Sequence, residues 1–167
     1  MLKKGLAYFG LLAAAAMTVT AGLPYAASAR TVGTCAPTKL KFVASDLFNS
    51  TADGGFVAVP EISLAFVQGG TAPGCVIVEF SGQAFASGPG SALISVDARL
   101  DGNDNDNYFP PQPQLAASDV MWGVRRSVTL VFAGVAPGPH TMKIYYRSAN
   151  GGSVELNRPL MIVHHVP

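Results

Sequence analysis

From residue 30 onward, apolar side chains alternate with polar ones in short runs, and clusters of Gly, Pro, Asn and Asp separate these runs. Alternation with a period of two residues is typical of β-strands that bury one face. No window after residue 30 combines a 3.6-residue apolar period with helix caps, so the pattern predicts an all-β fold. Eight strands are expected, namely Lys39–Ala44, Phe56–Val59, Ile62–Gln68, Cys75–Phe85, Ala92–Leu100, Ser127–Gly134, His140–Ser148 and Val154–Val166.

The predicted strands differ in how many apolar faces they carry. In His140–Ser148 the even-numbered side chains from Met142 to Tyr146 are apolar and lie on one face. Cys75–Phe85 is apolar on both faces, which indicates a strand in the centre of a sheet. The expected core consists of same-face residues of four strands: Val78, Phe80, Ile94, Val96, Leu130, Phe132, Ile144 and Tyr146.

Turn sequences separate the strands and indicate the architecture. Asp53-Gly54-Gly55 and Asn150-Gly151-Gly152 contain residues that accept positive φ, as tight hairpins require. Seven or eight strands at this spacing predict an antiparallel two-sheet sandwich that is jelly-roll-like. An Ig-like sandwich is the alternative, although Trp122 follows both cysteines and the Cys–Trp–Cys order of true Ig domains is absent.

The first 29 residues have the features of a secretory signal peptide. Lys3 and Lys4 give a positively charged start. Gly5–Gly22 follows as an apolar and small-residue run, and the small side chains of Ala27–Ala29 suit cleavage after Ala29. We therefore expect a signal peptide over 1–29 and a single β-sandwich domain over 30–167, secreted or periplasmic and without a further membrane segment. An uncleaved anchor is the alternative, because about eighteen apolar residues just span a bilayer.

Export makes the two cysteines informative. Cys35 and Cys75 are an even pair, and an oxidising compartment favours a disulfide between them. Closing a loop of about 40 residues stabilises a fold by roughly 4 kcal/mol in the chain-entropy model. Two buried free thiols are the alternative. No C-x-x-C motif is present to indicate a redox or metal role.

The charge balance excludes nucleic acid as a partner. Lys and Arg number 11 against 10 Asp and Glu, and two of the lysines lie in the predicted leader. The mature chain is therefore close to neutral and lacks the dense basic field that phosphate backbones require. With 49% hydrophobic and 13% charged residues, the chain also lacks the composition of a disordered protein.

The sequence DGNDNDN at 101–107 places three carboxylates and three amides just after a predicted strand. Hard oxygen ligands clustered on a loop suit Ca²⁺, which makes Asp101, Asp104 and Asp106 a weak calcium candidate. The EF-hand pattern is not met, because Asp106 and Gln112 stand where Gly and Glu are needed. We expect the alternative, an exposed turn that binds Ca²⁺ weakly or not at all.

Aromatic and basic side chains indicate a binding role. Tyr108 lies in the long loop 101–119, where its ring could stack on a sugar ring; the alternative is that it pins the loop to the sandwich. Trp122 and the two arginines that follow it precede one predicted strand, and Tyr145 and Arg147 lie on the polar face of another. Either group could bind a glycan or a small anion. An ordinary outer sheet face is the alternative. The candidate ligand-binding residues are Tyr108, Trp122, Arg125, Arg126, Tyr145 and Arg147, with Lys143 on the same strand face as the last two.

Signatures of catalysis are missing, since the sequence has no G-x-S-x-G, no H-E-x-x-H and no P-loop. Glycosidases need two carboxylates about 5–9.5 Å apart. Asp97 is expected to face water near a strand end, and Glu79 to lie half-buried or ion-paired on an apolar strand. His164 and His165 point to opposite strand faces, and His140 has no evident partner. We therefore expect no enzymatic activity, no metal on histidine and no cofactor.

Several turn motifs recur in order through the second half of the chain. The strand CVIVEFSGQA opens it, a strand closing in Asp-Gly follows at Val96–Gly102, Pro-Gly-x-His-Thr begins Pro137–Arg147, and Gly-Gly begins Gly151–Val163. In these motifs the chain resembles small secreted bacterial β-sandwich domains of uncharacterised function. The resemblance implies a secreted jelly-roll-like sandwich and brings no catalytic residues with it.

Three hypotheses of function follow. The first is an exported binding domain, and a groove lined by Trp122, Tyr145 and Arg147 would favour it. The second is a structural module that forms homo-oligomers through one sheet face, and a flat apolar outer sheet would favour it. The third is a small hydrolase, and two carboxylates converging in a cleft, one of them Glu79 or Asp97, would favour it.

Overall fold

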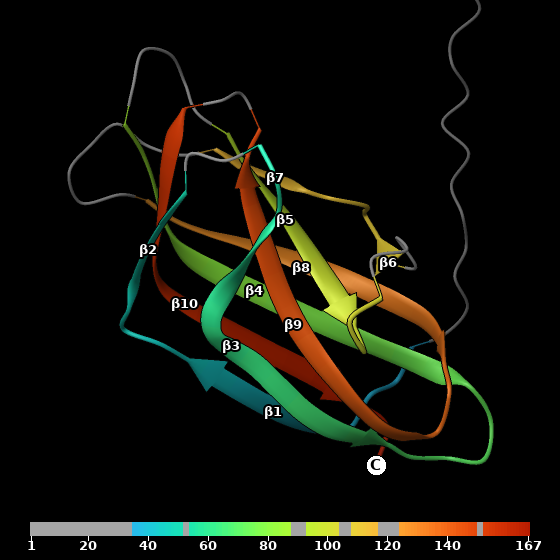
Figure 1. Cartoon of the computed structure of the whole chain (residues 1–167). Coiled ribbons are helices and arrows are strands. Elements are labelled where there is room, and N and C mark those ends of the chain that lie inside the picture. Colours follow the sequence, from blue (N-terminus) through green and yellow to red (C-terminus); the bar gives the residue numbers. More distant parts are fainter. Residues whose placement is uncertain (1–34, 52–53, 88–92, 104–107, 117–123, 150–151) are drawn as a thin grey trace, which may run out of the picture. The chain divides into compact units, whose positions relative to one another are not determined.

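The computed structural model describes residues 35–51, 54–87, 93–103, 108–116, 124–149 and 152–167. These residues contain strands and no helix, and the order of the strands can be followed in Figure 1. The strands are β1 (Lys39–Ala44), β2 (Phe48–Thr51), β3 (Val57–Gln68), β4 (Gly74–Ser87), β5 (Leu93–Leu100), β6 (Tyr108–Phe109), β7 (Gln114–Ala116), β8 (Val124–Val135), β9 (Gly138–Ser148) and β10 (Ser153–His165).

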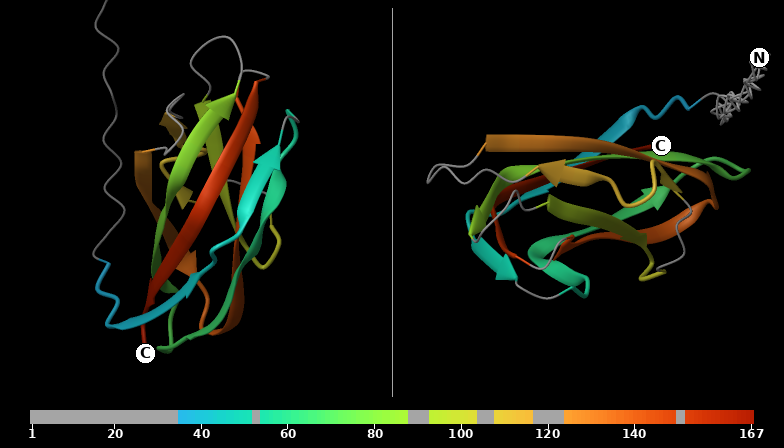
Figure 2. Two further views of the ribbon diagram at one scale, coloured as in Figure 1. Left: turned by 90° about the vertical axis from the view of Figure 1, so that its left-hand side faces the viewer. Right: turned by 90° about the horizontal axis from the view of Figure 1, so that it is seen from above.

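The strands form two antiparallel sheets that face each other as layers, seen from above in Figure 2. The six-stranded sheet has the order β1-β10-β4-β8-β6, and β2 pairs with another part of β10. The four-stranded sheet has the order β3-β9-β5-β7. The predicted all-β, antiparallel two-sheet sandwich is confirmed. The strand β4, apolar on both faces, lies between β10 and β8 as its sequence indicates.

The core lies between the two sheets, and all eight residues expected there are buried. In β9, Met142, Ile144 and Tyr146 face the core, whereas Lys143 on the other face is exposed, so the predicted register is confirmed. Burying each large apolar side chain contributes about 1.5–3 kcal/mol. The strand pattern therefore fixes which face of each sheet remains available for binding.

Two features of the strands differ from the expectation. Phe56–Val59 and Ile62–Gln68 belong mostly to one strand, β3, whose pairing with β9 is irregular between Ala58 and Ser63. Pro60 interrupts the sequence pattern, but β3 is an edge strand, where a proline and a bulge are tolerated. The short strands β2, β6 and β7 were not expected, because segments of two to four residues are too short to show alternation.

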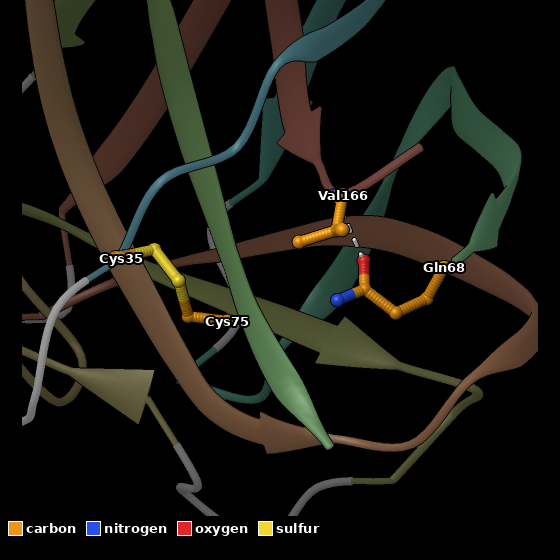
Figure 3. Close-up of a disulfide and its surroundings, with 4 residues drawn as sticks. All are labelled: Cys35, Gln68, Cys75 and Val166. Carbon is orange, nitrogen blue, oxygen red and sulfur yellow. Dashed lines mark hydrogen bonds between the residues drawn. A yellow bond between two sulfur atoms is a disulfide. The ribbon is translucent and has the colours of Figure 1, made fainter. Parts of the chain in front are cut away.

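Cys35 and Cys75 form the predicted disulfide, with their Cα atoms 5.6 Å apart. Cys35 precedes β1 and Cys75 lies in β4, and these two strands flank β10 on either side. The disulfide therefore ties β1 to β4 beside the end of β10 (Figure 3). There the backbone N–H of Val166 donates to Oε1 of Gln68, at 3.2 Å, which joins the segment after β10 to the other sheet.

Residues 1–34 lie outside the described part of the chain, so the signal peptide over 1–29 stays a prediction. Within the described residues, no helix has the length and apolarity needed to cross a membrane.

Candidate functional site

Asp97 of β5 is buried, with 3% of its surface exposed, so the expectation that it faces water is wrong. The hydroxyl of Tyr108 donates to its Oδ1 at 2.8 Å, and Nε of Arg99 donates to its Oδ2 at 2.8 Å. Both carboxylate oxygens are therefore engaged. The backbone N–H of the adjacent Val96 donates to the carbonyl oxygen of Pro113 at 3.0 Å. Asp97 and Val96 therefore anchor Tyr108 and Pro113 to β5.

Tyr108 is also buried, at 5% exposure, and its ring lies 5.1 Å from that of Phe132. The expectation that it is exposed and stacks on a sugar is wrong, and the alternative, that it pins the loop, describes it correctly. Burial and the hydrogen bond to Asp97 raise the pKa of the Tyr108 hydroxyl. The neighbouring Phe109 is the aromatic side chain that reaches the surface here.

Asp101 and His140 form a pair that the sequence did not indicate, since His140 was expected to have no partner. Oδ2 of Asp101 lies 2.6 Å from Nδ1 of His140, and Oδ1 accepts the backbone N–H of Thr141 at 2.8 Å. Nε2 of His140 lies 2.8 Å from the carbonyl oxygen of Ala136. Both partners of the ring are acceptors, so both ring nitrogens donate when the imidazole is protonated.

This arrangement decides what the pair can do. Burial alone would lower the pKa of His140, but its bonds to Asp101 and to the Ala136 carbonyl outweigh burial and raise it. Burial alone would raise the pKa of Asp101, but the hydrogen bonds from His140 and Thr141 outweigh burial, and the pKa of Asp101 is lowered. An imidazole with both nitrogens committed offers no lone pair for general base catalysis.

Asp101 lines two cavities of about 310 and about 260 Å³.

The calcium candidates cannot be placed as a set. Asp104 and Asp106 lie outside the described residues, and Asp101 directs both carboxylate oxygens at β9. Among the residues that the structure describes, no three His, Cys, Asp or Glu side chains group closely enough to hold a metal ion. The weak calcium site therefore stays an untested expectation for the rest of the loop.

Glu79 is exposed, and its Oε1 lies 3.0 Å from Nε2 of His164 on β10. It is thus an ion-paired surface carboxylate and not a half-buried one. His165 is buried whereas His164 is not, so the two rings do point to opposite faces. Glu79 and Asp97 lie in different sheets, so this pair of carboxylates does not converge.

The structure separates the candidate ligand-binding residues into different sheets. Arg125 and Arg126 lie on β8 in the six-stranded sheet, and Tyr145 and Arg147 lie on β9 in the four-stranded sheet. Arg125 donates to Oγ of Ser81 at 3.0 Å, so it lies along the outer face of its own sheet. Trp122 lies outside the described residues, so the expected groove with Tyr145 and Arg147 is not tested.

The outer face of the four-stranded sheet carries a group of cationic and aromatic side chains, which we call the basic aromatic face. The guanidinium of Arg99 lies 4.1 Å from the ring centre of Tyr145, and that of Arg147 lies 4.6 Å from the ring centre of Phe56. Lys143 is exposed on β9, two residues before Tyr145 on the same strand face. The basic aromatic face consists of Phe56, Arg99, Lys143, Tyr145 and Arg147.

Neighbouring strands determine how this face is presented. In β3, Ala58 lies opposite Tyr145 and Ser63 lies opposite Lys143, so small side chains flank the long ones. In β5, Asp97 and Arg99 lie opposite Tyr145 and Lys143, respectively. Arg99 and Phe56 were not predicted to belong to this face, because the pairing of β5 and β3 with β9 cannot be recognised from any of these strands alone.

The outer face of the six-stranded sheet carries a group of apolar side chains, which we call the apolar sheet face. One row of cross-strand neighbours runs from β1 to β6: Leu40, His164, Ile77, Val131 and Phe109. The next row is Phe42, Ile162, Glu79 and Thr129. Phe42 is 67% exposed, Phe109 60% and Leu40 53%. The apolar sheet face consists of Leu40, Phe42, Ile77, Phe109, Val131 and Ile162.

No family model matches the sequence, and no curated protein matches it. Three solved structures are similar to the chain at a low level. The dimeric latent PorU of Porphyromonas gingivalis is 13% identical, with a TM-score of 0.43 over 81% of this chain and 13% of the PorU chain. The C-terminal domain of EclA, a sugar-binding protein, is 12% identical, with a TM-score of 0.38 over 83% of this chain and 86% of that one.

The third is a family two carbohydrate esterase from Cellvibrio japonicus, 16% identical, with a TM-score of 0.28 over 77% of this chain and 36% of the esterase. The chain thus spans only a small part of PorU and about a third of the esterase. Structural similarities with TM-scores at this level carry no information about the function of this chain.

Proposed function

We propose that the protein is an exported, non-enzymatic binding domain that holds an anionic extracellular ligand, such as an acidic glycan, on its basic aromatic face. The observation that carries the proposal is the pair of guanidinium–ring stacks, with Lys143 beside them on the same outer sheet face. Within the described residues, the ion pair on this face joins Arg99 to Asp97, and Lys143 and Arg147 add positive charge to the face.

The side-chain chemistry fits such a ligand. Arginine and lysine bind carboxylate and sulfate groups through charge-assisted hydrogen bonds. Arg99 and Arg147 are already held against Tyr145 and Phe56, so a ligand has to order fewer rotatable bonds when it binds. Strands also position side chains more rigidly than loops do. The face is therefore organised for recognition in advance.

Two further observations support the proposal. The Cys35–Cys75 disulfide is of the kind that persists in secreted and periplasmic proteins, in agreement with the predicted leader. Against a hydrolase, the carboxylate of Asp97 and the imidazole of His140 both have every polar atom engaged in structural hydrogen bonds.

The test is binding of the purified protein to an array of neutral, uronate-containing and sulfated glycans, followed by calorimetry on the best binder. We expect acidic glycans to bind and their affinity to fall as salt is added. Lys143→Ala and Arg147→Ala should each weaken binding about tenfold. Arg125→Ala removes a cation from the other sheet and is the matched control, which should bind as the wild type does.

Binding to neutral glycans alone would contradict a role for the positive charge. An equal loss of affinity in Arg125→Ala would contradict the assignment to the basic aromatic face.

A further inference from the structure

We propose that the apolar sheet face is the interface of a homodimer, in which a second copy of this chain packs on it sheet to sheet. The proposal concerns the six-stranded sheet and does not depend on what the basic aromatic face binds. It assigns the exposed apolar side chains of β1 and β6 to one common role.

The exposure of this face is unusual for a surface that stays in water. Leu40, Phe42 and Phe109 are more than half exposed, and Phe42 and Phe109 pair with the apolar residues Ile162 and Val131. Ile77, Val131 and Ile162 lie in the same two rows and are half-buried, beside the polar side chains of His164 and Glu79. An exposed apolar patch of this kind marks an interaction surface on a soluble domain.

The size of the face suits a weak dimer. The sheet path contains five adjacent strands, of which β6 has only two residues. At a spacing of about 4.8 Å and about 3.4 Å per residue, the other four strands cover about 400 Å² over six or seven residues each. Two copies would then bury about 800 Å² in total, which is the size of a weak, reversible interface. Sheets pack face to face at about 10 Å through interdigitating apolar side chains.

The charges on the face favour a second copy as the occupant. Its central charged groups are Glu79 and His164, which lie side by side with opposite sign when the imidazole is protonated. A two-fold axis that runs between them places Glu79 of each copy over His164 of the other. Each copy then meets the other's acidic group with a basic one, as an isologous contact requires.

The opposite face of the sandwich cannot serve in the same way. Arg99, Lys143 and Arg147 would meet their own copies there, and like charges in contact repel. The molecule thus has one face that suits its own copy and one that excludes it.

The experiment is analytical ultracentrifugation of the purified protein from about 1 to about 100 μM, a range in which a specific dimer dissociates or persists measurably. We expect a monomer–dimer equilibrium. The variant Leu40→Glu/Phe42→Glu on β1 and, separately, Phe109→Glu on β6 should weaken the dimer at least about tenfold. Because these variants change different strands, misfolding of one leaves the other as a test, with circular dichroism and thermal melting as the check.

Val67→Glu is the matched control, because Val67 is 60% exposed on β3 in the other sheet. It should dimerise as the wild type does. A wild-type chain that stays monomeric up to the highest concentration would overturn the proposal. So would open-ended assembly, equal dissociation of the Val67→Glu control, or a monomer that uses this face to bind lipid vesicles instead.

Discussion

When its imidazole is protonated, His140 donates from both ring nitrogens, to Asp101 and to the carbonyl of Ala136. Its folded pKa is raised, so its contribution to stability is complete below the unfolded pKa of about 6.5 and is lost as the pH rises through the folded value. The folded pKa of Asp101 is lowered. Its contribution is complete above about pH 3.9 and is lost as the pH falls through the folded value.

We predict that Asp101→Asn lowers the pKa of His140, as measured by NMR titration of the imidazole protons. The decrease in melting temperature of the variant relative to the wild type should be largest between about pH 4 and pH 6.5, where both partners are charged. Glu79→Gln removes the partner of the other surface histidine, His164, and should leave His140 unchanged. If the pKa of His140 is the same in Asp101→Asn and the wild type, the pair does not hold the charge.

The second prediction concerns the hydrogen bond to the buried carboxylate of Asp97. Tyr108→Phe removes the donor to Oδ1 of Asp97 and leaves a buried acceptor without its hydrogen bond. Such a loss costs about 1–3 kcal/mol in the free energy of unfolding, measured by urea denaturation. Tyr145→Phe keeps the ring contact with Arg99 and is the control, with a change of less than about 0.5 kcal/mol. Equal stability of Tyr108→Phe and the wild type would refute the anchoring role.

Among the elements, β1 is the strand that depends most on a covalent tie. It is an edge strand that pairs only with β10 among the described residues, and the disulfide joins the segment before it to β4. We predict that Cys35→Ser/Cys75→Ser loses roughly 4 kcal/mol of unfolding free energy. Hydrogen exchange should speed up more at Lys39–Ala44 than in β4. Uniform exchange in both strands would show that β1 is held without the disulfide.

Long strands could be predicted from the sequence, and short ones and strand partners could not. Lys39–Ala44 has the predicted bounds, because alternation over six residues is enough to mark a strand. The structure places the predicted site residues Arg125 and Arg147 in different sheets. In the sequence each is only a polar-face residue of its own strand, so their separation could not be predicted. Which sheet a strand joins depends on long-range pairing, such as that of β5 with β9, and the local pattern carries no information about it.

For the whole molecule, the two proposals together predict cross-linking. A dimer joined through the six-stranded sheets carries its two basic aromatic faces on opposite outer sides, so it can join two glycan-coated particles. Wild-type protein should therefore aggregate particles coated with acidic glycan, measured by light scattering, whereas Leu40→Glu/Phe42→Glu should not. Both should bind a short soluble glycan equally, measured by calorimetry. A variant that loses affinity for the short glycan as well would show that the two faces are not independent.

The position of β10 has a consequence for how the chain is made. β10 follows every other strand in the sequence, yet it pairs with β1, β2 and β4 and so joins the earliest strands to the middle of the six-stranded sheet. A nascent polypeptide that lacks β10 leaves β1 and β2 without the strand they pair with and leaves one edge of β4 open. The six-stranded sheet is therefore completed only after β10 has been synthesised, and until then the open strand edges are sites at which two incomplete chains can pair with each other.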